Sequence, residues 1–351
     1  MTTPEETELT PSLPVAPVDR WLAPVTRFLH IEAASGVVLL ACTAVALALA
    51  NSPLAAWFAG VWKVPVSLSI GAFTVSGDVG HLIVNDGLMT VFFFVIGLEV
   101  KREMAHGELR DPRKALLPVF AALGGVMMPA AIYLALQWGE PGQRGWAIPM
   151  ATDIAFVVGF LALFGARVPF GLKILLLTLA IVDDLVAVLI IAFVFTDALA
   201  WGWLGWAAGA FVVVYVLHRI GVRSVGVYAI VGAFIWLAFM QSGVHPTVAG
   251  VLLGLLTPAR AWIGRQTLAH VLRAAWQRAS SEQRDPHAAP DDVGRTQFAA
   301  REAVSSLQRL EDGLHPWVAF VIMRAAIRSR PLQVRQLMRN DPDPPFVDFV
   351  P

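Results

Sequence analysis

The chain has 351 residues, of which 57% are hydrophobic and only 15% charged, with 26 Lys and Arg against 26 Asp and Glu. Soluble domains average about 45–50% apolar and about 25% charged residues, so this composition excludes an ordinary soluble enzyme and indicates an integral membrane protein. A net charge of zero offers no basic face to phosphates, so no nucleic-acid partner is expected. The single cysteine, Cys42, allows neither an intrachain disulfide nor a cysteine metal cluster.

The N-terminal region combines a polar tail with a first membrane helix. Residues 1–26 are rich in Thr, Pro and Glu and show no apolar period, which predicts a disordered tail. The first apolar segment, Gly36–Ala50, is followed by Asn51-Ser52-Pro53 rather than by a small-residue cleavage pattern. We therefore expect a retained helix and not a signal peptide.

Seven further apolar segments follow, most of them near the ~20 residues that cross a bilayer. They lie at 79–99, 115–136, 145–164, 170–195, 201–217, 225–240 and 245–256. Unpaired backbone groups are costly in lipid and the alternating pattern of a membrane barrel is absent, so the sequence predicts an all-α protein with eight membrane helices within residues 27–260. The last two segments are short enough to be tilted, broken or buried pieces.

The distribution of positive charge predicts the orientation. With the N-terminus in the cytoplasm, the inner segments hold 19 Lys and Arg, whereas the outer loops hold only Lys63 and Arg144. Cytoplasmic loops carry the excess of Lys and Arg in membrane proteins. We therefore expect a multi-pass protein with a cytoplasmic N-terminus.

The chain changes character after the eighth apolar segment. Residues 261–312 are polar and predict a cytoplasmic loop that is partly helical. Residues 313–323 begin a ninth apolar helix that is too short to span. Residues 324–351 form a tail rich in Arg, Pro and Asp, without a membrane segment.

Two adjacent carboxylates, Asp183 and Asp184, lie in the middle of the apolar segment 170–195. A carboxylate at the bilayer centre costs at least ~2.5–3.5 kcal/mol, so it persists mainly where it lines a cavity or an ion path. Neighbouring residues on a helix are about 100° apart, so we expect different roles for the two. Desolvation and like-charge repulsion raise their affinity for protons, as proton exchange requires. The alternative is a protonated, structural hydrogen bond.

Asp153 follows Pro149 and Thr152 in the apolar segment 145–164. Proline lacks a backbone donor and the threonine hydroxyl competes for local backbone bonds, so we predict a broken helix here. Interrupted helices supply free carbonyls for cations and helix ends whose partial charge Asp153 could balance. The alternative is a proline kink with a capping aspartate.

Further titratable residues lie near the ends of the predicted helices. Glu99 and Glu103 are four residues apart on one helix face, where ordinary pairing with Lys101 or Arg102 is the simpler interpretation. His245 and His315 could titrate near neutral pH. Each of these histidines alone is more often a satisfied buried residue than a pH sensor.

Five sequence motifs together resemble the NhaA-type sodium/proton antiporters of bacterial inner membranes. They cover roughly residues 27–323, in order and at family-like spacing. The motifs are Phe92-Phe93-Phe94-Val95-Ile96-Gly97-Leu98-Glu99-Val100-Lys101-Arg102-Glu103, Gly145-Trp146-Ala147-Ile148-Pro149 with Ala151-Thr152-Asp153-Ile154-Ala155-Phe156, Ala180-Ile181-Val182-Asp183-Asp184, Ser242-Gly243-Val244-His245 and Leu314-His315-Pro316-Trp317-Val318-Ala319.

The resemblance implies electrogenic exchange of cytoplasmic Na⁺, or Li⁺, for protons by alternating access, without a cofactor. Asp184 would be the main cation and proton carboxylate and Asp183 its partner and gate, whereas Thr152 and Asp153 would belong to an unwound stretch. A pH-responsive cytoplasmic funnel would include Glu99, Arg102, Glu103, Glu311 and His315, with His245 as a further pH-linked position. The partners expected are these ions, the lipid bilayer and a second copy in a homodimer.

The resemblance also implies a fold built from inverted repeats with a broken fourth helix. Family members continue past the Leu-His-Pro-Trp helix through three more helices, including a second broken helix and a lysine that pairs with the site aspartates. Here residues past Met323 do not match them, so the second repeat would be missing. A truncated, non-transporting homologue is therefore an alternative to an active antiporter.

An intramembrane aspartyl protease is a remote third alternative, motivated by the membrane aspartates. Such enzymes place one aspartate on each of two helices, one of them within Gly-x-Gly-Asp. That tetrad is missing from this sequence.

Overall fold

The computed structural model describes residues 32–70, 73–150, 167–194, 196, 199–222, 224–280, 288–318 and 322. In this part of the chain, five helices are long and apolar enough to cross a membrane, or six spans if one sharply bent pair counts as a span. The structure is therefore mostly helical, but fewer spans than the eight predicted are met within the described ranges. The predicted tails 1–26 and 324–351 lie outside the described residues.

The first span is bent. Its two parts are α2 (Glu32–Ala50) and α3 (Ala55–Trp62), and the segment Ala41–Ala50 of α2 meets α3 at an angle of 113°. The bend has a local cause, since the side chains of Asn51 and Ser52 donate back to backbone carbonyls of α2 and Pro53 has no backbone donor. The predicted helix is confirmed, with a break at its end.

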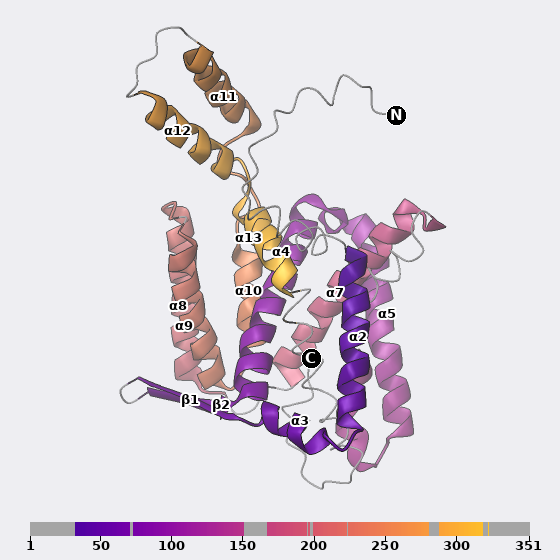
Figure 1. The fold of residues 1–351 in the computed structure, drawn as a ribbon. Coiled ribbons are helices and arrows are strands. Elements are labelled where there is room, and N and C mark those ends of the chain that lie inside the picture. Colours follow the sequence, from indigo (N-terminus) through magenta and orange to yellow (C-terminus); the bar gives the residue numbers. More distant parts are fainter. Residues whose placement is uncertain are drawn as a thin grey trace.

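A two-stranded antiparallel hairpin follows, formed by β1 (Pro65–Ile70) and β2 (Phe73–Asp78) with Ser67 opposite Ser76. It corrects the all-α prediction. The run Val66-Ser67-Leu68-Ser69-Ile70 alternates apolar and polar residues, as one face of a strand requires. The hairpin lies at the end of the bundle opposite to α11 and α12 (Figure 1).

The second span runs from Val79 to His106 and is longer than the predicted 79–99. Its first part, η2 (Val79–Leu88), is a π-helix, and α4 (Met89–His106) continues it as an α-helix. The Asp78 carboxylate caps η2 by accepting from the backbone N–H of His81 at 2.7 Å. Long π-helices are rare and occur preferentially at functional sites.

The next span, α5 (Pro112–Leu136), packs against α7 (Phe170–Val194), and both match their predicted ranges. Between them the predicted membrane helix 145–164 is only partly described. Residues up to Met150 form 3₁₀-helical turns, η4 (Pro141–Met150), with a kink at Gly145, rather than an α-helix. Residues 151–164, with the predicted break at Thr152 and Asp153, lie outside the described ranges, so that break stays a prediction.

The spans α8 (Trp201–Arg219) and α9 (Val225–Ser242) form a helical hairpin. Small residues, among them Ala207, Ala210 and Ala238, are buried at its interface and let the backbones approach. Large apolar side chains such as those of Trp206 and Ile230 are exposed on the outer faces. Such surfaces suit contact with lipid.

The last predicted membrane segment is a short, buried helix, α10 (Thr247–Leu256), with ten residues, too few to span. It packs directly along α4, because a Cβ atom at Gly250 would lie 2.3 Å from the carbonyl oxygen of Thr90 and one at Gly254 would lie 2.5 Å from that of Phe94. The order of these contacts shows that the two helices run in the same direction. This packing favours the alternative of a buried piece for this segment.

The polar stretch 261–312 folds as a helical hairpin, α11 (Arg265–Ser280) and α12 (Ala288–Glu302), which projects beyond the bundle (Figure 1). The helix predicted to begin at residue 313 begins earlier, as α13 (Ser306–Trp317), because the Ser305 hydroxyl accepts from Gln308 N–H and caps it.

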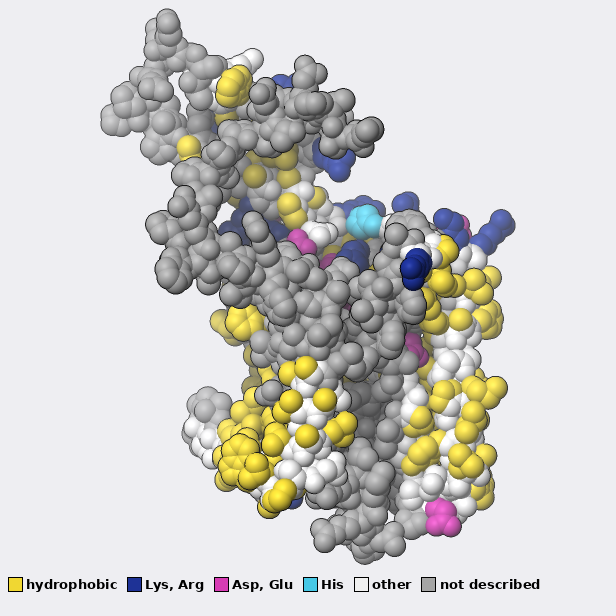
Figure 2. All heavy atoms as spheres, turned by 45° about the vertical axis from the view of Figure 1, so that its right-hand side comes forward, with side chains coloured by type: hydrophobic (Ala, Val, Ile, Leu, Met, Phe, Trp, Pro, Cys, Tyr) yellow, Lys and Arg dark blue, Asp and Glu magenta, His cyan; other side chains and the backbone are white. Residues whose placement is uncertain are grey.

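Positive charge gathers at one end of the bundle. Figure 2 shows hydrophobic side chains over the flank and most of the visible Lys and Arg side chains at the end from which α11 and α12 project. Lys101 and Arg102 at the end of α4, and Arg113 and Lys114 at the start of α5, belong to this end. This is the polarity that the sequence predicts for the cytoplasmic face.

Candidate functional site

Two adjacent carboxylates lie buried in the middle of α7. Asp183 and Asp184 are 6% and 7% exposed, with apolar helix on both sides. Burial at this depth matches the expectation that they line an interior site and do not face lipid.

The two carboxylates lie on different faces of α7. Ile181 and Val188, which flank Asp184 at helical spacing, pack in the core with α4 and α10. Val186 and Ile190, which share a face with Asp183, pack against α5 and η4. Asp184 therefore faces α4 and α10, whereas Asp183 faces α5 and η4. Distinct surroundings are the physical basis for the distinct roles predicted for the pair.

The other two predicted ion-site residues, Thr152 and Asp153, lie outside the described residues. The described part of the same motif ends at Met150, which is buried against Val126, Ala130 and partly buried residues of α7. The described part of the motif thus ends beside the side of α7 that carries Asp183. Its geometry beyond Met150 is not described.

A charged cluster joins the end of α4 to α13. The Arg102 guanidinium donates a hydrogen bond to, and forms an ion pair with, the carboxylate of Glu311, which is buried although the arginine is 35% exposed. Glu99 is partly buried and within electrostatic reach of Arg102, Glu103 and Glu311. The structure therefore brings together four of the residues predicted for the cytoplasmic funnel.

Glu311 of α13 lies outside the membrane spans, and its surroundings shift the pKa of its carboxyl group. Burial raises the pKa of its carboxyl group above the usual value, while the positive charge of Arg102 opposes the rise. Asp312, next along the chain, raises the pKa further, and the exposed His315 lowers it. His315 thus acts on Glu311 electrostatically, while its own side chain lies at the surface.

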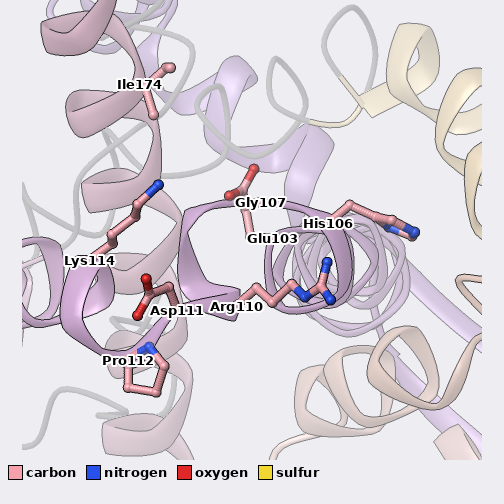
Figure 3. A pocket seen from close by; sticks show the side chains of 8 residues that line it. All are labelled: Glu103, His106, Gly107, Arg110, Asp111, Pro112, Lys114 and Ile174. Carbon is pink, nitrogen blue, oxygen red and sulfur yellow. The ribbon is translucent and has the colours of Figure 1, made fainter.

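A cavity of about 640 Å³ opens beside this cluster, between the ends of α4, α5 and α7. Its lining is charged, with contributions from Glu103, His106, Arg110, Asp111 and Lys114. Figure 3 shows Lys114 and Asp111 on one side, Arg110 and His106 on the other, and Glu103 between them. Because charges of both signs line it, the cavity carries no single-signed field that would favour cations over anions.

His245, predicted as a pH-linked position, lies away from this cluster. Gly243 adopts a left-handed conformation with φ of +83° and ends α9, and His245 follows in the short break before α10. Its ring is buried, with Nδ1 2.9 Å from the Thr247 hydroxyl. Since α10 runs parallel to α4, His245 lies level with the start of α4 and not with its charged end.

The family model for Na⁺/H⁺ antiporter 1 matches residues 26–326. The chain belongs to the Na⁺/H⁺ antiporter 1 family. It is similar to the Na⁺/H⁺ antiporter NhaA of Rhodopirellula baltica, with 50% identity over 313 residues that cover 89% of this chain and 71% of that protein. The protein of the same name from Rhizobium meliloti is 49% identical over 312 residues, with the same coverage. Na⁺/H⁺ antiporter NhaA 2 of Sorangium cellulosum is 49% identical over 315 residues, covering 89% of this chain and 67% of that protein.

The resemblance that the motifs predict is therefore confirmed. The protein is a multi-pass membrane transporter for Na⁺ and H⁺ and not an enzyme. The extent of the family match, 26–326, agrees with the 27–323 expected from the motifs.

Sequence reasoning missed two charged contacts of this antiporter. Near the start of α4, the Nε2 atom of His81 is 3.8 Å from a carboxylate oxygen of Asp86. Asp86 is only 5% exposed. On the opposite side of the protein, Glu302 of α12 is buried and lies 3.6 Å from Arg309 of α13. The five-residue spacing of His81 and Asp86 carries no α-helical signal, and no pattern indicates that α12 ends against α13.

Proposed function

We propose that the antiporter exports Na⁺, or Li⁺, from the cytoplasm in exchange for protons and that Asp184 and Asp183 are its ion- and proton-binding carboxylates. The observation that carries this assignment is the burial of both side chains in mid-span, on two different faces of one helix. Acidic residues inside a membrane protein characteristically mark ion paths and proton relays.

Competition between a cation and protons for these two carboxylates would couple the two fluxes. Two carboxylates at neighbouring positions repel one another when both are ionised, and desolvation adds to that cost. A bound Na⁺ or a bound proton relieves it, so the site holds one or the other. Asp184 is assigned as the main ion-binding group and Asp183 as its partner and gate.

Thr152 and Asp153 are assigned to the same site. Oxygen ligands suit a small hard cation, and backbone carbonyls freed by an interrupted helix would complete the set. Asp153 would compensate the partial positive charge of a helix N-terminus. Support comes from the position of the preceding Met150, which packs beside the helix that carries Asp183.

The pH response is assigned to the cluster at the charged end of α4, namely Glu99, Arg102, Glu103, Glu311 and His315, with His245 as a separate titratable position. The support is the contact between Arg102 and the buried Glu311. Because burial raises the pKa of the Glu311 carboxyl group, its charge changes at a higher pH than that of an exposed glutamate.

We assign the antiporter to the bacterial inner membrane, with a cytoplasmic N-terminus, and expect a homodimer. The lopsided distribution of Lys and Arg supports the orientation (Figure 2). Labelling of cysteines introduced at Lys63 or Lys114 with a membrane-impermeant reagent in intact cells tests it: only position 63 should react from outside. Light scattering of the detergent-solubilised protein tests the dimer.

The function is tested in everted vesicles with a dye whose fluorescence is quenched by an acid interior. Addition of Na⁺ should dequench the dye in vesicles that contain the wild-type protein, and Asp184→Asn should abolish this signal. Leu189→Asn serves as a control for a polar change on an exposed position of the same helix. Equal signals from wild type and Asp184→Asn would exclude the assignment of Asp184.

A further inference from the structure

Glu302 is a buried acidic residue that the exchange mechanism does not use. It is the last residue of α12 and is only 6% exposed, although it lies outside all membrane spans. Its carboxylate lies 3.6 Å from the guanidinium of Arg309 on α13, and its backbone carbonyl accepts a hydrogen bond of 3.1 Å from Ile263 N–H. Glu302 thus joins the entry of the hairpin α11–α12, its exit and α13.

The base of this hairpin is held at a second point. The backbone N–H of Leu307, the second residue of α13, donates to the carbonyl of Pro258 just after α10. Leu307 and Ala299 are both buried at this junction. The hairpin is therefore anchored to α13 at its base, while its helices project away from the bundle (Figure 1).

The helix α13 is held by charge at two positions two residues apart. Arg309 is paired with Glu302 of the hairpin, and Glu311 is paired with Arg102 of α4. Arg309 also donates to the Ser306 hydroxyl at 3.3 Å, which orients its guanidinium. The charged groups that act on Glu311 are Arg102, Glu99, Asp312 and His315. A rotation or shift of α13 that broke one of these pairs would therefore disturb the other.

We propose that Glu302 is a positioning residue through which the hairpin α11–α12 sets the pH response of the antiporter. By holding Arg309, it fixes α13 at the orientation that places Glu311 on Arg102. This inference rests on the assignment of the pH response to that cluster, and it adds the hairpin as the element that regulates it.

The direction of the effect follows from electrostatics. When glutamine replaces Glu302, its attraction for Arg309 is lost and α13 is held less firmly. The contact of Glu311 with Arg102 is then populated less often. The ionised form of Glu311 then loses stabilisation, and its ionisation requires a higher pH. Because partly exposed ion pairs contribute little, the expected size is about a threefold change in this equilibrium, which corresponds to about half a pH unit.

Transport gives the first test. Dequenching in everted vesicles is measured from acid to alkaline pH for wild type, Glu302→Gln and Glu302→Asp. Glu302→Gln should move the activation midpoint by about half a pH unit to the alkaline side with an unchanged maximal rate, and Glu302→Asp should restore it at least in part. The matched control is Arg301→Gln, the neighbouring exposed charge, which should leave the midpoint in place. An unchanged midpoint in Glu302→Gln, or a rate lowered by the same factor at every pH, would overturn the proposal.

A measurement that needs no transport gives the second test. With the native Cys42 replaced by serine, spin labels are placed at two exposed positions, Met104 of α4 and Gln308 of α13. The distance distribution between them should be narrow in the wild-type background and broader in Glu302→Gln. Identical distributions would overturn the proposal. If vesicles show no Na⁺ response that depends on Asp184, the proposed ion site fails, and the spin-label result still decides on the role of Glu302.

Discussion

The span 79–106 takes part in a pair of a buried carboxylate and a basic side chain near each of its ends, Asp86 with His81 and Glu311 of α13 with Arg102, but the two pairs differ in kind. Near the β-hairpin, Asp86 lies 3.8 Å from the ring of His81, which is 39% exposed. Near the hairpin α11–α12, Glu311 is hydrogen-bonded to Arg102. Arginine keeps its charge at any physiological pH, whereas histidine ordinarily loses its charge between pH 5 and 8.

The difference between arginine and histidine decides which partner of each pair can change its charge with pH. At the Arg102 end the counter-charge of the pair is permanent, so within the pair only the Glu311 carboxyl group can change its charge. At the His81 end the basic partner is an imidazole, which attracts a carboxylate electrostatically only when it is protonated. The Arg102 pair is thus expected to respond to pH through its carboxylate and the His81 pair through its basic side chain. The following substitutions test this difference.

The largest effect is expected from separating α4 from α10. The contact between these two helices lies between the His81 pair and the Arg102 pair. In Gly250→Ala the new Cβ would lie 2.3 Å from the carbonyl oxygen of Thr90, a backbone atom that cannot yield easily. Overpacking of this kind costs about 1–3 kcal/mol, which thermal unfolding in detergent measures. Gly209→Ala on α8 is the matched control, since nothing lies within 4 Å of its added Cβ. Equal melting temperatures for the two variants would contradict the close packing.

The next effect is expected from Arg102→Gln, which removes the permanent charge. It leaves Glu311 buried without its counter-charge and should destabilise the protein by about 1–2 kcal/mol at neutral pH, less than for a fully buried pair because Arg102 is 35% exposed. The measurement is thermal unfolding, and the double variant Arg102→Gln/Glu311→Gln provides the control. If the double variant is no more stable than Arg102→Gln, the buried carboxylate is not the cause.

A smaller, pH-dependent effect is expected from Glu311→Gln. Because burial raises the pKa of this carboxyl group in the folded state, the folded protein binds its proton more tightly than the unfolded chain. Its contribution to stability is therefore largest below the ordinary glutamate pKa and declines as pH rises toward the raised value. The stability of wild type relative to Glu311→Gln should fall across this window and stay constant above it. A difference that does not change with pH would contradict the raised pKa.

The smallest effect is expected from His81→Gln, because the ring is partly exposed and its contact with Asp86 is long. Its contribution should be below about 1 kcal/mol and confined to acid conditions, where the ring is protonated. Unfolding temperatures at pH 5.5 and pH 8 measure this, with wild type and variant differing only at the lower pH. A difference of the same size at both would show that packing and not charge is responsible.

The long membrane spans are the part of the fold that the sequence predicts well. Runs such as 115–136 and 170–195 carry their own signal, because only a helix satisfies the backbone in lipid. The β-hairpin was missed since its alternation covers only a few residues beside much longer apolar runs. The π-helical form of η2 has no residue signature, and the early start of α13 depends on one capping residue, Ser305.

In the candidate site, too, the burial of residues within an apolar run was predictable, but contacts between distant parts of the chain were not. Burial of Asp183 and Asp184 was predictable from their place in an apolar run. The contact of Arg102 with Glu311 joins residues 209 positions apart, so no spacing rule could predict it, and only the family resemblance placed them together. The pairs His81–Asp86 and Glu302–Arg309 depend on how helices end and pack, which the sequence does not reveal.

The glycine contacts between α4 and α10 have a mechanical consequence. Where Gly97, Gly250 and Gly254 meet the neighbouring backbone, no layer of flexible side chains lies between the helices to absorb a sliding movement. We therefore expect the two helices to move together. A displacement of α4 at its Arg102 end would then be passed to α10 and toward His245, which precedes α10.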